Sequence, residues 1–136
     1  LLNHLAYVGV LTLELFVTEH GLLANEMAPR MHNSGHWSIE GAVCSQFENH
    51  MRAVAGLPLG STELISECMM VNIIGRHPKR EDGLKLSGAH LHFYGKEERV
   101  GRKLGHVTLI PTQGNTLAGL SSELAKILPE PLALKG

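Results

Sequence analysis

Two short apolar runs separated by a polar turn constrain the fold of this chain more than any other feature. Residues 7–17 are rich in Val, Leu and aromatic side chains, residues 22–26 form a second run, and residues 18–21 lie between them. This pattern predicts a β-hairpin. Each strand also carries one carboxylate, Glu14 in the first and Glu26 in the second, so the hairpin places two acids on one small sheet.

The length of the turn decides whether the two carboxylates meet. A four-residue loop at 18–21 pairs Glu14 with Asn25 and sends Glu14 and Glu26 to opposite faces of the sheet. A five-residue loop places the two acids opposite each other, about 5 Å apart, where they repel unless a cation lies between them. Mg²⁺ prefers such carboxylate oxygens and bridges them to phosphates. The structural alternative is that Glu14 caps a loop or forms an ion pair with Arg30, and both interpretations stay open.

The segment that follows the hairpin, residues 25–37, is dense in polar and charged side chains. It includes Arg30, His32 and Asn33 ahead of Trp37. Charged groups taken out of water are costly unless they are paired. This density therefore indicates a site that a metal ion or an anionic ligand completes.

The rest of the chain predicts alternating helices and strands. Residues 38–55 are expected to form one helix, because Ser38 can cap its start and five apolar residues from Ile39 to Val54 share one stripe. Strands are predicted at 69–75, 89–94 and 105–111, and a second helix at 115–128 with its leucines on one face. Residues 76–83 are interpreted as a solvated polar loop.

Residues 95–106 form a second candidate site. They combine basic side chains, among them Lys96, Arg102 and Lys103, with flexible glycines that let a loop close over a ligand. A phosphate is the ligand that such a loop suits. A basic hairpin tip, neutralised locally by Glu97 and Glu98, is the alternative.

Composition excludes several classes of protein. A net charge of −1 argues against nucleic-acid binding, for which a basic face is expected. No apolar run reaches the length of a membrane span. Two isolated cysteines at Cys44 and Cys68 suggest a reducing compartment, and a cytoplasmic location is therefore expected.

Several motifs together resemble one family of ligases. From residue 9 to about 111, roughly three quarters of the chain is similar to the C-terminal part of N5-carboxyaminoimidazole ribonucleotide synthetases, ATP-grasp enzymes of purine synthesis. The matching runs are residues 13–17 (LELFV), 21–30 (GLLANEMAPR), 32–37 (HNSGHW), 45–50 (SQFENH) and 101–106 (GRKLGH). The run from Asn25 through Trp37 makes the resemblance specific to this family.

The resemblance implies an α+β fold. It predicts the C-terminal half of an ATP-grasp domain, an antiparallel sheet with helices, over residues 1–56. A small strand-and-helix domain, similar to a rudiment single hybrid motif, is expected over residues 57–136. Because an ATP-grasp enzyme needs far more than 136 residues, the chain is expected to be a C-terminal fragment that is inactive alone.

The resemblance also implies a reaction and roles for residues. ATP, bicarbonate and 5-aminoimidazole ribonucleotide would give the N5-carboxylated product, ADP and phosphate through carboxyphosphate. Glu14 and Glu26 would bind Mg²⁺ or Mn²⁺, and Asn25 and Glu26 would contact ATP. The catalytic residues would be Arg30, His32 and Asn33, with Arg30 and His32 also contacting the substrate. The ribonucleotide phosphate would be bound by Lys96, Arg102 and Lys103.

Partners and competing functions follow from the same resemblance. The intact enzyme is expected to be a homodimer, with a mutase or carboxylase partner either fused or separate. One competing function is a non-catalytic ribonucleotide-binding or dimerisation fragment. Another is a sibling ATP-grasp carboxylase or a formate-using ligase, which would keep Glu14 and Glu26 but would not need residues 32–37 together.

Overall fold

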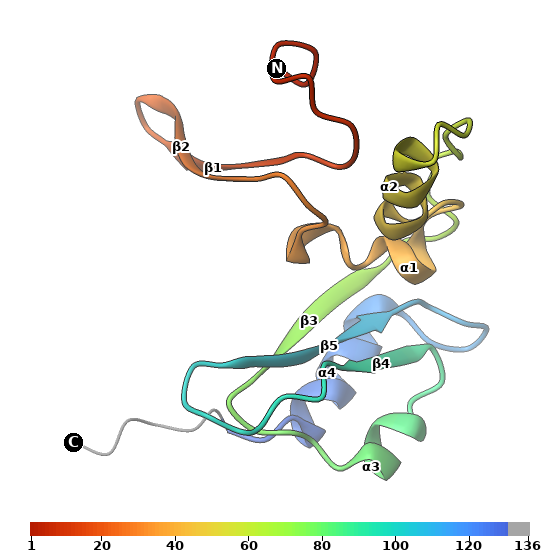
Figure 1. The fold of residues 1–136 in the computed structure, drawn as a ribbon. Coiled ribbons are helices and arrows are strands. Elements are labelled where there is room, and N and C mark those ends of the chain that lie inside the picture. Colours follow the sequence, from red (N-terminus) through yellow and green to blue (C-terminus); the bar gives the residue numbers. More distant parts are fainter. Residues whose placement is uncertain (131–136) are drawn as a thin grey trace. The chain divides into compact units, whose positions relative to one another are not determined.

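The computed structural model describes residues 1–130 and divides the chain into two compact units (Figure 1). The first unit is Leu1–Leu64, and the second begins at Ile65. The division therefore follows Leu64, whereas the sequence places a domain boundary after Gly56. Helices are combined with antiparallel sheets in the chain, which confirms the predicted α+β class.

The first unit begins with the predicted hairpin. Strand β1 (Thr12–Thr18) pairs antiparallel with β2 (Gly21–Ala28). Near the turn the register is that of the shorter loop, because Val17 pairs with Leu22. A β-bulge between Glu14 and Leu15 then shifts the register by one residue, so that Glu14 pairs with Glu26. The two carboxylates thus meet although the turn is short.

The predicted single helix over residues 38–55 is wrong. Instead, the short 3₁₀ turn η1 (Asn33–Gly35) is followed by α1 (Ser38–Gly41) and a separate α2 (Gln46–Val54). Ala42 is extended and forms a β-bridge with Leu64, and the Val43 N–H donates to the Glu63 carbonyl at 2.9 Å. The Ser45 hydroxyl then accepts from the Glu48 N–H and starts a new helix.

The apolar stripe assigned to that single helix is not buried either. Four of its five members are exposed in the structure, Ile39, Val43, Met51 and Val54, and Phe47 is half-buried. A pattern of period 3.6 was present, but the backbone pairing of residues 42–43 and the second cap interrupt the helix that the pattern assumed.

The second unit contains a three-stranded antiparallel sheet in the order β3-β5-β4 (Figure 1). The strands are β3 (Met69–Ile74), β4 (Ala89–Phe93) and β5 (Lys103–Leu109). The first two agree with the sequence prediction, and the third begins at Lys103, earlier than expected. A short helix, α3 (Arg80–Leu84), occupies part of the segment predicted as a polar loop.

Helix α4 (Leu117–Ile127) completes the second unit and confirms the predicted amphipathic helix. Its Thr116 cap accepts from the Gly119 N–H, and its leucines pack on the sheet. The core consists of fully or nearly fully buried apolar side chains: Ile73, Leu104, Val107, Leu109, Leu120 and Leu124. Across residues 1–130, no helix has the length and apolar character needed to cross a membrane.

Candidate functional site

The bulge brings two carboxylates and an amide together on the hairpin. Glu14 on β1 and Glu26 on β2 are cross-strand partners, with side chains 42% and 48% exposed. Asn25, the extra residue on β2, donates a hydrogen bond from its Nδ2 to Glu14 Oε1. The amide therefore orients one carboxylate of the pair.

His32 lies against this acid pair and is almost buried, with a side chain 11% exposed. Its Nε2 is 3.1 Å from Glu26 Oε1 and 3.6 Å from Glu14 Oε2. The Ser34 backbone N–H donates to Nδ1 at 3.3 Å. Because Nδ1 accepts, the ring proton of the neutral imidazole is on Nε2 and faces the carboxylates. His32 is thus placed as a hydrogen-bond donor toward the acid pair.

Arg30 joins the same cluster from the exposed side. Its Nη2 is 3.9 Å from Glu26 Oε1, and its Nη1 donates to the Met31 carbonyl at 2.9 Å. The ion pair formed by Arg30 in the described part of the chain is therefore with Glu26, and the alternative pairing with Glu14 is wrong. Asn33 follows at the start of η1, where its carbonyl accepts from the His36 N–H.

Gln46 is a residue of this site that the sequence analysis missed. Its Oε1 accepts from the His32 N–H at 3.1 Å, and its Nε2 donates to the His32 carbonyl at 2.7 Å and lies 2.8 Å from His36 Nδ1. One side chain from the start of α2 therefore fixes both backbone groups of His32. The sequence signal that could have indicated this role is Ser45, which can cap a new helix beginning at Gln46. The prediction of one continuous helix over residues 38–55 overlooked it.

The acid pair fits a hard divalent cation in its chemistry. Carboxylate oxygens are the donors that Mg²⁺ prefers, and the two acids are open enough to admit further ligands. Within residues 1–130, no three His, Cys, Asp or Glu side chains are arranged as a metal site. A metal ion here would therefore take its remaining ligands from water or a phosphate.

The basic residues of the second candidate site lie on the connection between β4 and β5 and at the start of β5. Residues 94–102 form this connection, and Gly95 and Gly101 both adopt positive φ, near +65° and +68°. The Lys96 ammonium lies 5.5 Å from the centroid of the Tyr94 ring. Arg102 Nη1 is 3.5 Å from the Glu97 carbonyl, and Lys103 is the first residue of β5.

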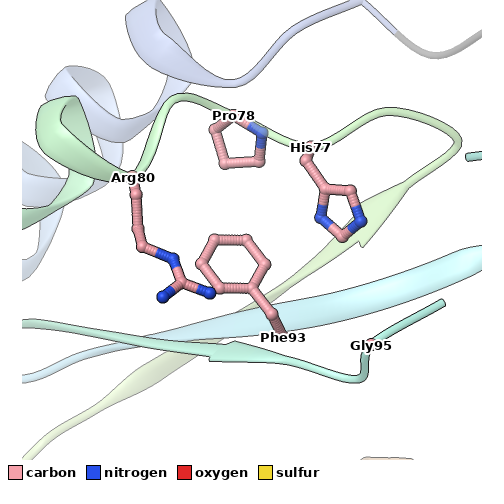
Figure 2. A pocket seen from close by; sticks show the side chains of 5 residues that line it. All are labelled: His77, Pro78, Arg80, Phe93 and Gly95. Carbon is pink, nitrogen blue, oxygen red and sulfur yellow. The ribbon is translucent and has the colours of Figure 1, made fainter. Parts of the chain in front are cut away.

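A pocket lies beside this loop and includes residues interpreted from sequence as plain surface. Its volume is about 220 Å³, and its lining is His77, Pro78, Arg80, Phe93 and Gly95 (Figure 2). The His77 N–H donates to Glu98 Oε1 at 2.8 Å, and His77 Nε2 is 3.2 Å from the Lys96 carbonyl. The 76–80 segment is therefore fixed to the basic loop. Mixed charges in that segment gave no signal of this contact.

Two family models match the chain. The ATP-grasp domain matches residues 1–47, and the phosphoribosylaminoimidazole carboxylase C-terminal domain matches residues 68–118. The N5-carboxyaminoimidazole ribonucleotide synthase of Pseudomonas aeruginosa is 53% identical over 127 residues, which are 93% of this chain and 35% of the relative. The Escherichia coli protein of the same name is 46% identical over 129 residues, 95% of this chain and 36% of the relative.

Solved structures agree with these sequence matches. N5-carboxyaminoimidazole ribonucleotide synthetase from Thermus thermophilus has a TM-score of 0.85 and 54% identity, covering 95% of this chain and 36% of that chain. The Aspergillus clavatus synthase, solved in complex with ADP and 5-aminoimidazole ribonucleotide, has a TM-score of 0.72 and 35% identity, covering 88% and 34%.

This chain thus spans about a third of the length of the curated relatives that it matches. The two family models also match it in the order hairpin unit and then three-stranded unit. The resemblance seen in the sequence motifs is confirmed by the high identities and by the agreement of the folds. Over nearly all of its length the chain is therefore similar to about a third of the length of the N5-carboxyaminoimidazole ribonucleotide synthases, and it matches the ATP-grasp domain and the phosphoribosylaminoimidazole carboxylase C-terminal domain in turn.

Proposed function

We propose that this chain carries part of the active site of an ATP-dependent ligase that carboxylates the exocyclic amine of 5-aminoimidazole ribonucleotide. The substrates would be ATP, bicarbonate and the ribonucleotide, and the products N5-carboxyaminoimidazole ribonucleotide, ADP and phosphate. Names of the relatives and the ADP and ribonucleotide complex of the Aspergillus clavatus protein support this assignment. The observation that carries it is the convergence of Glu14, Glu26 and His32 within 3.6 Å.

The acid pair would hold the metal and the nucleotide. Glu14 and Glu26 would bind Mg²⁺, or Mn²⁺ in its place, while Asn25 would orient Glu14 and contact the nucleotide. When bound, the metal neutralises charge on the ATP phosphates during phosphoryl transfer. Both carboxylate side chains are partly exposed, which leaves room for the phosphates.

The residues after the hairpin would act on the carboxyl donor. Arg30 would bind the anionic oxygens of carboxyphosphate through its planar fork of N–H donors. His32, with its proton on Nε2, would donate a hydrogen bond to bicarbonate or to the carboxyphosphate, and Asn33 would orient the same group. The near-complete burial of His32 keeps water from competing for that proton.

The basic loop of the second unit would bind the ribonucleotide. Lys96 and Lys103 would act as point charges toward its phosphate, and Arg102 would form paired hydrogen bonds. Positive φ angles at Gly95 and Gly101 support a loop whose backbone can approach a ligand closely.

The test compares this chain alone with a chimera in which it replaces the matching 127 residues of the Pseudomonas aeruginosa relative. ADP release is measured with Mg²⁺-ATP, bicarbonate and 5-aminoimidazole ribonucleotide. We expect turnover that depends on the ribonucleotide in the chimera and none in the isolated chain. Turnover with formate in place of bicarbonate would favour a sibling ligase. Failure of a folded chimera to turn over would contradict the proposal.

A second candidate function is non-catalytic binding of the ribonucleotide. The basic loop belongs entirely to the second unit, which has its own core, so it could bind without the acid pair. Calorimetric titration of the isolated chain with 5-aminoimidazole ribonucleotide tests this function. A homodimer and a mutase or carboxylase partner also stay predictions, and sedimentation of the chimera checks the dimer.

A further inference from the structure

We propose that the pocket of His77, Pro78, Arg80, Phe93 and Gly95 is a binding site for a phosphate group, in a small phosphate monoester or as free phosphate (Figure 2). This inference goes beyond the proposed function, because none of these five residues has a part in the carboxylation. It does not require that the chain take part in a ligase. Four observations carry it: a preorganised guanidinium, a fixed imidazole, the charge of the surroundings and the size of the pocket.

Arg80 supplies the guanidinium. Its Cζ lies 5.0 Å from the centroid of the Phe93 ring, and Figure 2 shows the side chain reaching along that ring inside the pocket. Contact with the ring face holds the guanidinium but leaves its N–H groups unused. Among residues 1–130, the Arg80 side chain makes no hydrogen bond and no ion pair. Its planar fork of donors is therefore positioned and available for an anion.

His77 forms the opposite wall. Its ring meets the Phe93 ring edge-on, with centroids 5.3 Å apart and an angle of 65°. A carbonyl can only accept, so the 3.2 Å contact with the Lys96 carbonyl places a proton on His77 Nε2. The backbone N–H of the same residue is bound to Glu98. Two contacts from one loop thus fix this wall before a ligand arrives.

Two segments that contribute residues to the pocket lining are rich in basic residues. Those segments are residues 76–80 and 95–102, and the side chains are Arg76, Lys79, Arg80, Lys96, Arg99 and Arg102. The acids nearest in sequence are fewer: Glu81, Asp82, Glu97 and Glu98. Of these, Asp82 is paired with Lys85 at 2.8 Å, and Glu98 is bound to the His77 N–H. The remaining charge is positive and favours an anion.

The size of the pocket selects among anions. About 220 Å³ is below the range of pockets that enclose a drug-sized ligand, so a whole nucleotide would not fit inside it. A phosphate group presents three oxygens and nearly two negative charges near neutral pH, which match a guanidinium fork better than a single carboxylate does. Phe93 and Pro78 offer apolar surface for the sugar carbons of a monoester.

The first experiment titrates the chain with inorganic phosphate at constant ionic strength and follows Arg80 Nε–H and the His77 ring by NMR. We expect saturable shifts of both groups. Arg80→Gln should weaken binding about tenfold or more, because a charge-assisted hydrogen bond is lost. Arg99→Gln is the matched control: it removes the same charge from the neighbouring loop but not from the pocket, and it should change the affinity by less than about twofold.

Several results would overturn the proposal. NMR shifts that do not saturate would mean that phosphate is attracted only by the overall positive charge and not bound in the pocket. An equal loss of phosphate affinity in Arg80→Gln and Arg99→Gln would mean the same. Loss of binding in Arg102→Ala but not in Arg80→Gln would place the phosphate on the loop instead. Arg80→Lys keeps the charge without the fork, and intermediate affinity is expected. Unchanged amide signals of β5 in each variant show that it is folded.

A second arm identifies the source of the phosphate. Ribose 5-phosphate and inorganic phosphate are titrated separately. Tighter binding of ribose 5-phosphate supports a monoester seated with its sugar on Phe93 and Pro78, and equal affinity supports recognition of the phosphate alone. Because this readout uses no ATP turnover, failure of the carboxylation assay leaves the pocket proposal intact, and loss of phosphate binding leaves the carboxylation proposal intact.

Discussion

The two units of the chain differ in where their apolar side chains lie. In the first unit, the hairpin exposes Phe16, Val17 and Leu22, with Val17 86% exposed. In the second unit, Val107, Leu109 and Leu124 are at most 1% exposed. Apolar burial is the main stabilising contribution to folding. The second unit therefore has a core of its own, whereas the hairpin presents the kind of apolar surface that marks an interaction site.

The two units also differ in how their polar groups are paired. Those of the first unit bind one another: Tyr7 donates to the Pro29 carbonyl at 2.7 Å, His50 Nδ1 accepts from the Val10 N–H at 3.0 Å, and Gln46 binds His32. In the second unit the Lys and Arg side chains of residues 76–80 and 95–102 form no ion pair with an acidic side chain among the residues that the structure describes. A network that is satisfied internally fixes geometry, and unpaired cations attract ligands.

The largest effect is predicted from the separate roles proposed for the two units, metal binding by the acid pair and ribonucleotide binding by the basic loop. In the chimera, Glu26→Gln removes a charge from the acid pair and should reduce ADP formation about 100-fold or more, because the proposed metal site would lose one of its two carboxylate ligands. Binding of the ribonucleotide should be nearly unchanged. Arg102→Ala should instead raise the ribonucleotide KM about tenfold and preserve kcat. Steady-state kinetics and calorimetry measure both.

The opposite outcomes would break this comparison. Loss of ribonucleotide affinity in Glu26→Gln would remove the metal assignment from the acid pair. An unchanged KM in Arg102→Ala would return the loop to a plain basic hairpin tip. Arg99→Gln, on the same loop, serves as the control for a simple loss of charge.

A pair of leucine truncations tests the difference in burial. Leu124→Ala opens a cavity in the core of the second unit and should lower the free energy of unfolding by about 2–5 kcal/mol. Leu22→Ala on the exposed hairpin should change it by less than about 0.5 kcal/mol. Urea unfolding monitored by amide hydrogen exchange in β5 measures the effect of Leu124→Ala. Urea unfolding monitored by the fluorescence of Trp37, the single tryptophan, measures the effect of Leu22→Ala. Equal effects would contradict the contrast between the units.

Gln46→Leu tests whether polar contacts stabilise the first unit. It removes the bonds to the N–H and carbonyl of His32 and should cost about 1–3 kcal/mol, because buried backbone groups lose their partner. Trp37 fluorescence in urea reports the loss. Gln113→Leu makes the same change on an exposed loop and should be almost neutral. A neutral Gln46→Leu would mean that His32 is positioned by other contacts.

The smallest effect is expected from the exposed ion pair of α2. Arg52 hydrogen-bonds Glu48 and holds the pKa of that carboxyl below its ordinary value. A carboxyl with a lowered pKa in the folded state contributes stability above its unfolded pKa, and this contribution is lost as the pH falls through the folded pKa. Glu48→Gln should therefore flatten the acid limb of the stability profile of the first unit slightly. In the second unit Lys85 lowers the pKa of the Asp82 carboxyl in the same way, so Asp82→Asn is the corresponding substitution there.

Local pattern predicted much of the fold but not its interruptions. Strands β1 to β4 and helix α4 follow from periodicity and caps near each element. The break between α1 and α2 does not, because it depends on the pairing of Ala42 with Leu64, which lies far along the chain. The bulge was not predicted for a related reason. Counting residues from the turn assumes that the two strands pair in one register along their whole length.

The same distinction holds for the candidate sites. Family motifs pointed to Glu14, Glu26 and His32, and the structure brings these three together. Gln46 lies in the matching run 45–50 but was assigned no role, and Arg80 lies in no matching run, since the significance of each arises from contacts with segments that the sequence does not place nearby. Residues that act through tertiary neighbours are the ones that pattern alone leaves out.

The bulge at Asn25 also bears on how this hairpin can change in evolution. It stores one surplus residue between the turn and Glu26. If a codon between Leu22 and Asn25 were deleted, the bulge would be consumed and the strands would pair regularly, with Glu26 still opposite Glu14. The acid pair is therefore buffered against a single deletion on the turn side. An insertion at the same place would add a second unpaired residue to β2 and would separate the two carboxylates.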